Sequence, residues 1–297
     1  MNNYNLAKLS ALYASEIAQK QNFMIKIGTY VLTNTQNGNL NNAKIEEIVD
    51  QAADIYRRGR KVAIITSGAV AAGRAEAEKN EKARQYLASI NEGLALRQAL
   101  AAIGQPKLME KYNEYMGKQG IVAAGQFLAS YGDLADPTHK QNFVNTINSL
   151  YALGAIPILN ENDPFSTDEL ETANGNGKIS GSITFGDNDL LSVMTAQTLE
   201  SQVLFLLSKE DGLMDFATHR KIDIIDDRYY AMQYLSDAKS AGGTGGMKSK
   251  LESIARATDS GIFVVLASGL EENIILRILQ GEPLGTLFLP KNFKYTA

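Results

Sequence analysis

Residues 61–73, KVAIITSGAVAAG, indicate the fold of this chain. The apolar run over residues 61–66 is rich in β-branched side chains and is typical of a buried strand. Ser67, Gly68 and Ala69 follow at once, and the small residues that continue from them predict a tight turn into a helix. A strand that passes directly into a helix is the repeating unit of α/β proteins.

The same alternation of strands and helices continues along the rest of the chain. Apolar runs predict strands at residues 23–27, 61–66, 121–124, 155–159, 203–207 and 262–266. Helical spacing of apolar residues predicts helices at residues 5–18, 45–56, 67–73, 84–103, 106–117, 140–153, 188–199, 247–259 and 271–280. Residues 164–185 are rich in Gly, Asn, Thr and Ser, which predicts a hairpin or lid. Strands that alternate with helices form right-handed crossovers, so we expect a three-layer α/β/α sandwich with a mainly parallel central sheet.

The composition is that of a globular protein, and it excludes several kinds of chemistry. The 297 residues can form one large or two medium domains, with 44% hydrophobic and 21% charged residues. A net charge of -4 argues against bulk binding to nucleic acid or to an anionic membrane. The chain has no cysteine, which excludes disulfides, thiol catalysis and cysteine–zinc sites. The two histidines, His139 and His219, lie far apart in sequence and argue against a transition-metal cluster.

The sequence gives no sign of a membrane segment or a targeting signal. No apolar run approaches the roughly 18 residues of a membrane span. The first twenty residues are interrupted by polar side chains and lack the apolar core of a signal peptide. We therefore expect a cytoplasmic protein. If a metal ion takes part, oxygen ligands and phosphates would hold it, which favours Mg²⁺.

A second informative stretch is the glycine-rich segment 242–250, GGTGGMKSK. Its glycines expose backbone N–H groups, and Lys248 and Lys250 stand at the start of a predicted helix. Backbone donors, the positive end of a helix dipole and an ammonium group together bind phosphate. The segment is not a P-loop, because Met247 stands where that pattern needs its second glycine. A flexible surface turn before a helix is the alternative interpretation.

Polar residues collect where the predicted strands end. In open α/β sheets, ligands bind outside the carboxyl ends of the strands. Each group of polar residues alone could be an ordinary cap or turn. Their placement at one edge of one sheet favours a site, and it favours the phosphate interpretation of segment 242–250. The groups are Lys26-Ile27-Gly28-Thr29, Thr66-Ser67-Gly68-Ala69, Asn160-Glu161-Asn162-Asp163, Gly186-Asp187-Asn188-Asp189 and Ser208-Lys209-Glu210-Asp211-Gly212.

The residue types at this edge favour phosphoryl transfer. Lys26 and Lys250 flank carboxylates and amides, and these groups contain no histidine. Phosphoryl transfer depends mostly on positioning and on charge neutralisation, which lysines, backbone amides and Mg²⁺ supply. A carboxylate acceptor has a pKa of about 4.3, so it is ionised at neutral pH and needs no general base. The site therefore fits a carboxylate acceptor better than an alcohol.

In their order and spacing, these segments resemble glutamate 5-kinases of the amino-acid kinase superfamily over about residues 23–290. The matching segments are Lys26 to Thr29 with Val31-Leu32-Thr33, Thr66 to Arg74, Ala101 to Gln105, Ile156 to Asp163, Phe185 to Asp189, Gly243 to Met247 and Gly285 to Phe288. The resemblance implies the amino-acid kinase fold and ATP-dependent, Mg²⁺-assisted phosphorylation of the L-glutamate side-chain carboxylate. The product is γ-glutamyl phosphate, the first intermediate toward proline. The resemblance also implies a homo-oligomer, either a dimer or a tetramer.

The resemblance divides the chain and assigns roles to its residues. Residues 23–290 form one kinase domain, with a substrate lobe over about 23–185 and a nucleotide lobe over 186–290. An N-terminal helical extension, residues 1–22, precedes this domain, and a tail, residues 291–297, follows it. Lys26 and Lys250 would neutralise the transferring phosphoryl group, and Asp187 would hold both lysines in place. The implied glutamate ligands are Ser67, Gly68, Ala69, Asn160, Asp163 and Asn188. The implied nucleotide ligands are Lys26, Gly28, Thr29, Ser208, Lys209, Gly243, Thr244, Gly245, Gly246, Met247 and Lys250, and no protein ligand to a metal is assigned.

The chain departs from the family pattern in several places. Lys209 stands where the family has Asp, and residues 212–216 diverge from the family's Gly-Leu-Tyr segment. Ile147 and Asn148 replace an Arg-Asp pair, and residues 164–185 are longer than usual. The chain ends shortly after Pro290, so we expect no C-terminal RNA-binding-like (PUA) domain. These departures leave open a related kinase for another small acid or phosphate, or a non-catalytic amino-acid or nucleotide sensor. Retention of both lysines and of Asp187 argues against the sensor.

Overall fold

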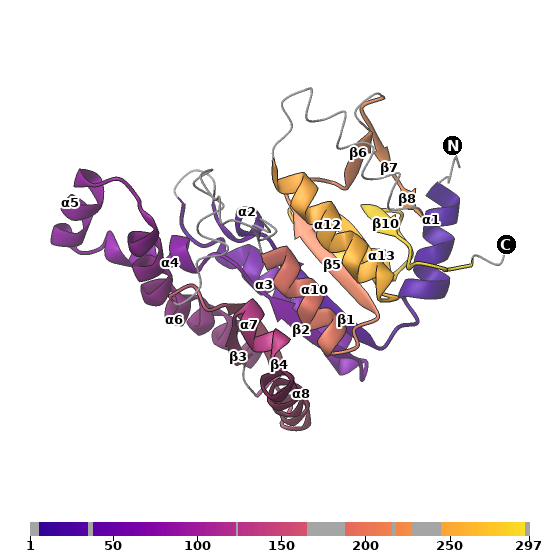
Figure 1. Cartoon of the computed structure of the whole chain (residues 1–297), viewed down its shortest axis with the longest axis horizontal. Helices are drawn as coiled ribbons and strands as arrows, with labels where there is room; N and C mark the ends of the chain where they lie inside the picture. The colour runs from indigo at the N-terminus through magenta and orange to yellow at the C-terminus, as the bar shows by residue number, and fades with distance from the viewer. Residues whose placement is uncertain are drawn as a thin grey trace.

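The computed structural model describes residues 6–34, 38–122, 124–164, 188–215, 218–226 and 245–294. Within these ranges, eight strands form one sheet (Figure 1). They are β1 (Asn22–Ile27), β2 (Lys61–Ile65), β3 (Ala124–Ala129), β4 (Ile156–Glu161), β5 (Val203–Ser208), β8 (Ile224–Ile225), β9 (Phe263–Ser268) and β10 (Thr286–Phe288). Their order across the sheet is β3-β4-β2-β1-β5-β9-β10-β8. Only the β9–β10 pair is antiparallel among these strands, so the prediction of a mainly parallel sheet is confirmed.

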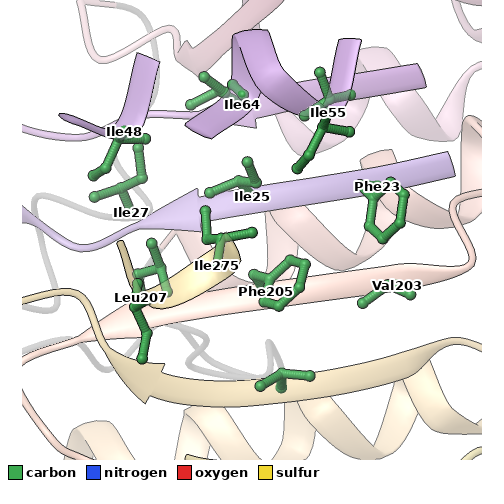
Figure 2. Packing of buried hydrophobic residues seen from close by; sticks show 14 of the residues in the cluster. Phe23, Ile25, Ile27, Ile48, Ile55, Ile64, Val203, Phe205, Leu207 and Ile275 are labelled. Carbon is green, nitrogen blue, oxygen red and sulfur yellow. The ribbon is translucent and has the colours of Figure 1, made fainter. Parts of the chain in front are cut away.

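Helices cover both faces of this sheet. Successive strand residues point to opposite faces, and apolar side chains on each face pack against the helices on that side. Phe23, Ile25 and Ile27 pack into one apolar core, part of which Figure 2 shows, and Met24 packs into the other. The first core includes side chains of α1 (Leu6–Leu12), a π-helix η1 (Tyr13–Ile17), α3 (Asn42–Arg57), α6 (Leu94–Lys118) and α13 (Ile274–Leu279). The second includes side chains of α7 (Tyr131–Ala135), α8 (Pro137–Ala152), α10 (Asn188–Thr198) and α12 (Gly245–Asp259). The predicted three-layer sandwich is therefore confirmed.

Side-chain caps set where several of the helices begin. The Asn41 side chain accepts a hydrogen bond from the Lys44 N–H at the start of α3. The Asp136 side chain does the same for the His139 N–H at the start of α8, whose first residue is Pro137. Both arrangements satisfy backbone donors that the helix itself leaves unpaired. Every helix in the described part of the chain is too short or too polar to span a lipid bilayer.

Several predicted boundaries were wrong. The helices expected at 84–103 and 106–117 are instead α5 (Glu81–Ser89) and α6, which runs without a break through Pro106. Packing of α6 on its neighbours outweighs the roughly 3 kcal/mol that an internal proline costs. The strand expected at 121–124 is β3, which begins at Ala124, where pairing with β4 begins. The short elements α7, β6 (Leu213–Asp215), β7 (Arg220–Ile222), β8 and β10 were not predicted, because each is too short to show a periodic pattern of apolar residues.

Two glycines allow a close contact between α4 (Ala69–Ala77) and α6. A Cβ atom on Gly73 would lie 1.8 Å from the Leu100 carbonyl oxygen, and one on Gly104 would lie 1.9 Å from the Ala69 carbonyl oxygen. No side chain fits at either position, so the two backbones touch directly. This contact fixes the position of α4, which begins where β2 ends.

We predict that Gly73→Ala destabilises the protein by about 2–3 kcal/mol or more, because the new methyl group overlaps backbone atoms that cannot move freely. Gly117→Ala is the matched control. Gly117 also lies in α6, but a Cβ atom there would meet no atom within 4 Å. This control should gain about 0.5–1 kcal/mol from helix propensity. Urea unfolding measures both free energies, and equal stabilities for the two variants would contradict the contact.

Candidate active site

Lys26 and Lys250 meet at one buried carboxylate, that of Asp189. Lys26 Nζ lies 2.7 Å from Asp189 Oδ1, and Lys250 Nζ donates a 2.5 Å hydrogen bond to Asp189 Oδ2. Lys26 comes from β1, Asp189 from the start of α10 and Lys250 from α12. The exposed fraction is 3% for the Lys26 side chain, 2% for Asp189 and 13% for Lys250. The fold therefore joins three distant parts of the sequence in one cluster.

The electrostatics of this cluster favour an anion. Burial alone would raise the pKa of Asp189, but Lys250 and Lys26 outweigh burial and hold that pKa below its usual range. One carboxylate between two ammonium groups leaves one positive charge in a site that excludes water. A buried charge is costly unless it is paired, so Asp189 makes the burial of the two lysines possible.

The family resemblance assigns to Asp187 the role of holding both lysines. Asp187 lies outside the described residues, so that prediction stays untested. Among the described residues, Asp189 contacts both ammonium groups, and the sequence pattern had given this residue a place at the sheet edge but no role. The signal for its role is its place as the second residue of α10, next to Asn188.

A pocket of about 320 Å³ lies beside this cluster. Its wall includes Asn188, which directly precedes Asp189 in the chain. All six predicted substrate ligands line this single pocket: Ser67, Gly68, Ala69, Asn160, Asp163 and Asn188. Gly68 adopts a left-handed backbone conformation, with φ of 99°, which turns the chain from β2 into α4. Ala69, Val70 and Ala71, in the first turn of α4, line the pocket, and the N–H groups of a first helical turn have no partner within their own helix.

Buried amide side chains fix the pocket wall. Asn188 Nδ2 donates to Ser67 Oγ at 3.2 Å and to Asn160 Oδ1 at 3.3 Å. Asn160 Nδ2 in turn donates to Gln105 Oε1 at 2.9 Å. Among the described residues, no donor reaches Asn188 Oδ1, which is buried at the pocket. This oxygen is therefore placed to accept a hydrogen bond from a ligand.

Two arginines, which the sequence analysis did not assign to the site, also line the pocket. Arg74 lies on α4 and Arg97 on α6, and both accompany Asp163 in the pocket wall. Arg74 Nη2 lies 2.5 Å from Glu92 Oε2, which orients the guanidinium group. Arg74 was visible at the end of the segment from Thr66, whereas Arg97 reaches the pocket only because α6 packs on α4.

The pocket makes Asp163 a weaker acid than an ordinary aspartate. Burial, with the nearby Glu161, raises the pKa of Asp163 to about 7, although Arg97 acts in the opposite direction. The Asp163 carboxyl therefore ionises less readily than that of an ordinary aspartate. A ligand ammonium group would favour its ionised form.

Two of the residues that depart from the family pattern lie away from the pocket wall. Ile147 is fully buried in the second apolar core, on α8. Asn148 Oδ1 accepts a hydrogen bond from Lys61 Nζ at 3.4 Å. Neither residue lines the pocket in the described part of the chain.

Among the residues predicted to bind nucleotide, Ser208 and Lys209 lie at the end of β5, which pairs with β1 on the side away from the pocket strands β2 and β4. Gly28 precedes α2 (Thr29–Leu32), and its N–H donates to the Leu207 carbonyl oxygen at 2.9 Å. Ser208 ends β5, and Lys209 Nζ lies 5.8 Å from the centre of the Tyr30 ring. Thr29, by contrast, lines the acceptor-side pocket. Gly245 and Gly246 begin α12, and Met247 packs against the second core. Gly243 and Thr244 lie outside the described residues.

Comparison with known proteins shows the family to which this chain belongs. Residues 23–268 match the amino acid kinase family, and the chain belongs to this family. It is similar to the glutamate 5-kinase of Moorella thermoacetica, with 34% identity over 286 residues that span 94% of this chain and 69% of that protein. It is also similar to the glutamate 5-kinase of Clostridium acetobutylicum, with 36% identity over 275 residues that span 91% of this chain and 94% of that protein. The family resemblance in the sequence is thus confirmed.

Solved structures show the same fold at low sequence identity. A carbamate kinase from Giardia superposes with a TM-score of 0.61 and 16% identity, over 92% of this chain and 100% of that one. A UMP kinase from Bacillus anthracis superposes with a TM-score of 0.54 and 14% identity, over 91% and 96%. These likenesses confirm the amino-acid kinase fold and say nothing about the acceptor.

We predict that Asp163→Asn stabilises the free protein at pH 8 and weakens binding of an ammonium-bearing ligand. The folded-state pKa of Asp163 lies above the ordinary aspartate value of 3.8, so its contribution to stability is complete below about pH 4 and is lost as pH rises toward 7. Asparagine stays neutral, so the variant should gain roughly 1–4 kcal/mol over wild type above pH 7.

Thermal unfolding between pH 4 and 8 measures this difference, with the exposed Glu272→Gln as the control. A constant difference across that range would contradict the assigned acidity of Asp163.

Proposed function

We propose that this protein is a glutamate 5-kinase. It transfers the γ-phosphoryl group of ATP to the side-chain carboxylate of L-glutamate, giving γ-glutamyl phosphate and ADP, the first step of proline biosynthesis. The observation that carries this proposal is the Lys26–Asp189–Lys250 cluster beside a pocket that holds both acidic and basic side chains. The glutamate 5-kinases to which the chain is similar match it over more than nine-tenths of its length.

The charges of the pocket fit an acidic amino acid. Arg74 and Arg97 supply positive charge for the α-carboxylate, and guanidinium groups suit carboxylates. Asp163 and Asn188 Oδ1 supply acceptors for the α-ammonium group. With its head group held there, the side-chain carboxylate of glutamate extends toward the lysine cluster. An amino acid without a second carboxylate would leave that cluster without an acceptor.

The reaction needs no proton transfer. A carboxylate oxygen of glutamate attacks the γ-phosphorus, and the bond from that phosphorus to the β–γ bridging oxygen breaks. Lys26 and Lys250 neutralise charge on the transferring phosphoryl oxygens, while Asp189 keeps both ammonium groups in position. Because these groups are buried and already ordered, they stabilise the transition state without reorganising.

The phosphoryl donor approaches from the side opposite the pocket, where β5 and β9 end and α12 begins. Ser208, Lys209, Gly28 and the residues from Gly243 to Met247 are the proposed nucleotide ligands. The described residues contain no group of three His, Asp or Glu side chains suited to a metal ion, and Lys26 and Lys250 engage both oxygens of Asp189. We therefore assign Mg²⁺ to the nucleotide phosphates, where it would neutralise developing charge.

The same proposal extends to the organisation of the protein. The acceptor pocket draws its residues from 29–163 and from Asn188, and the donor side is built mainly from 203–269. This division supports a substrate lobe and a nucleotide lobe. A homo-oligomer in the cytoplasm is the assembly and location that the resemblance implies, and light scattering of the purified protein tests the assembly.

The test of the function is to trap the acyl phosphate with hydroxylamine. Wild-type protein with L-glutamate, ATP and Mg²⁺ should form glutamyl hydroxamate and release ADP, and omission of any one component should abolish this. A panel of small acids under identical conditions tests the acceptor. A higher rate with another acid would favour a related kinase, and ligand binding without turnover would favour a sensor.

We predict that Lys26→Ala and Lys250→Ala each lower kcat by about 10²–10³, because each removes a positive charge from the transition state. Lys79→Ala is the control, since the Lys79 side chain is 71% exposed and pairs only with Glu76 among the described residues. Steady-state ADP release measures the rates. Near-native turnover in both site variants would refute the roles assigned to the lysines.

A further inference from the structure

We infer that the N-terminal helix, residues 6–17, positions the nucleotide-side turn, residues 208–212, through the hydrogen bonds of Tyr13 and of Thr286, which the backbone of residues 284–286 connects. Tyr13 and Thr286 are thus positioning residues for the phosphoryl donor. This inference rests on the proposed function for the identity of the donor as ATP. It adds a role for a segment that precedes the residues matched by the family.

The N-terminal helix is part of the main core. Leu9, Leu12, Tyr13 and Ile17 are all fully buried, and they belong to the same apolar cluster as Leu287 of β10. Figure 1 shows this helix at the end of the molecule where β8 and β10 lie. A segment that merely covered a sheet edge would need only these apolar contacts.

The helix also makes two directed hydrogen bonds to the segment that leads into β10. Tyr13 OH donates to the Leu284 carbonyl oxygen at 2.6 Å, and Ser10 Oγ donates to the Gly281 carbonyl oxygen at 2.5 Å. Burial, with Asp223 and Asp211 nearby, raises the pKa of Tyr13, so its hydroxyl stays a donor at any physiological pH. These bonds fix the chain two residues before Thr286.

Thr286 carries the connection from β10 to the β6–β7 hairpin. Its buried Oγ1 donates to the Ile222 carbonyl oxygen at 2.6 Å and accepts from the Leu213 N–H at 2.8 Å. Leu213 begins β6 and Ile222 ends β7, so this single hydroxyl binds both ends of the hairpin. Leu213 is also the residue that follows the turn 208–212.

The contact between Thr286 and the turn leaves little freedom. Gly212 has φ of 127°, and a Cβ atom there would lie 2.5 Å from Thr286 Oγ1. On the other side, a Cβ atom on Gly285 would lie 2.5 Å from the Leu266 carbonyl oxygen of β9. Because both neighbours are this close, a displacement of Thr286 must move Gly212 as well.

The turn that is held in this way faces the donor. The acceptor pocket lies on the β2 and β4 side of the lysine cluster, so the donor must approach from the side where β5 ends. The turn begins at Ser208, the last residue of β5, whose carbonyl oxygen accepts from the Gly269 N–H at 2.8 Å. A shift in the position of Gly212 would therefore change the fit of the nucleotide and leave the acceptor pocket intact.

The test compares Tyr13→Phe and Thr286→Val with Ile17→Val, which trims the same core without removing a hydrogen bond. Affinity for the non-hydrolysable analogue AMP-PNP with Mg²⁺ is measured by calorimetry, together with KM for each substrate. Thr286→Val should weaken AMP-PNP binding roughly tenfold, because the Leu213 N–H loses its buried acceptor, and Tyr13→Phe about threefold. KM for glutamate and kcat at saturating ATP should stay unchanged. Thr286→Ser keeps the hydroxyl and should restore most of the affinity.

The outcomes separate this inference from the proposed function. Wild-type affinity in Thr286→Val and Tyr13→Phe, or an equal loss in Ile17→Val, would overturn the positioning role and leave the kinase intact. Wild-type protein that binds AMP-PNP but forms no glutamyl hydroxamate would contradict the proposed acceptor, while the affinity series would still support the positioning role. A smaller combined loss in the Tyr13→Phe, Thr286→Val double variant than the product of the single losses would show that both act on one path.

Discussion

The ion pairs of Asp189 with Lys26 and Lys250 are the interaction on which the rest of the site depends. Two ammonium groups cannot be buried side by side without an opposing charge, since desolvation and mutual repulsion would favour loss of a proton. Asp189 gives one oxygen to each lysine, and its position in the first turn of α10 is favourable for a carboxylate. The cluster also joins β1, α10 and α12. These three elements meet at one edge because β1, β5 and β9 are parallel, so the chemistry depends on the parallel arrangement of the sheet.

The sheet order separates the two substrates around this cluster. On one side, β2 and β4 deliver the pocket residues, and the glycine contact between α4 and α6 fixes the pocket wall. On the other side, β5 and β9 end near the start of α12. Asp163 lowers the stability of the free protein at neutral pH, because burial of this carboxyl disfavours the ionised form that would bind an ammonium group. Such a cost is typical of binding sites that are organised before the ligand arrives.

Much of this arrangement could be predicted from the sequence. Strands such as β1 and β5 are confirmed to within one residue, because strands buried on both faces are continuous apolar runs. The polar residues at the ends of these strands also indicate the site, because parallel strands bring their carboxyl ends to one edge of the sheet. The proline at position 106 misled the prediction, because tertiary packing of α6 overrode a local helix-breaking preference.

Contacts between distant residues could not be predicted. The contact of Asp189 with both lysines depends on where α10 begins in space, which no local pattern in the sequence gives. Arg97 enters the pocket only through helix packing. Tyr13 donates a hydrogen bond to Leu284, 271 positions away. No local pattern could therefore show that the N-terminal helix is part of the core and not an extension outside it.

The most direct test of the central claim is a crystal structure of the protein with ADP, Mg²⁺, aluminium fluoride and L-glutamate. Aluminium fluoride imitates the transferring phosphoryl group. We predict that its fluorine atoms lie within hydrogen-bonding distance of both Lys26 Nζ and Lys250 Nζ, with Asp189 still between the lysines and the glutamate side chain in line. A fluoride complex bound elsewhere, or one that leaves both lysines paired only with Asp189, would show that the two lysines do not act on the transferring phosphoryl group.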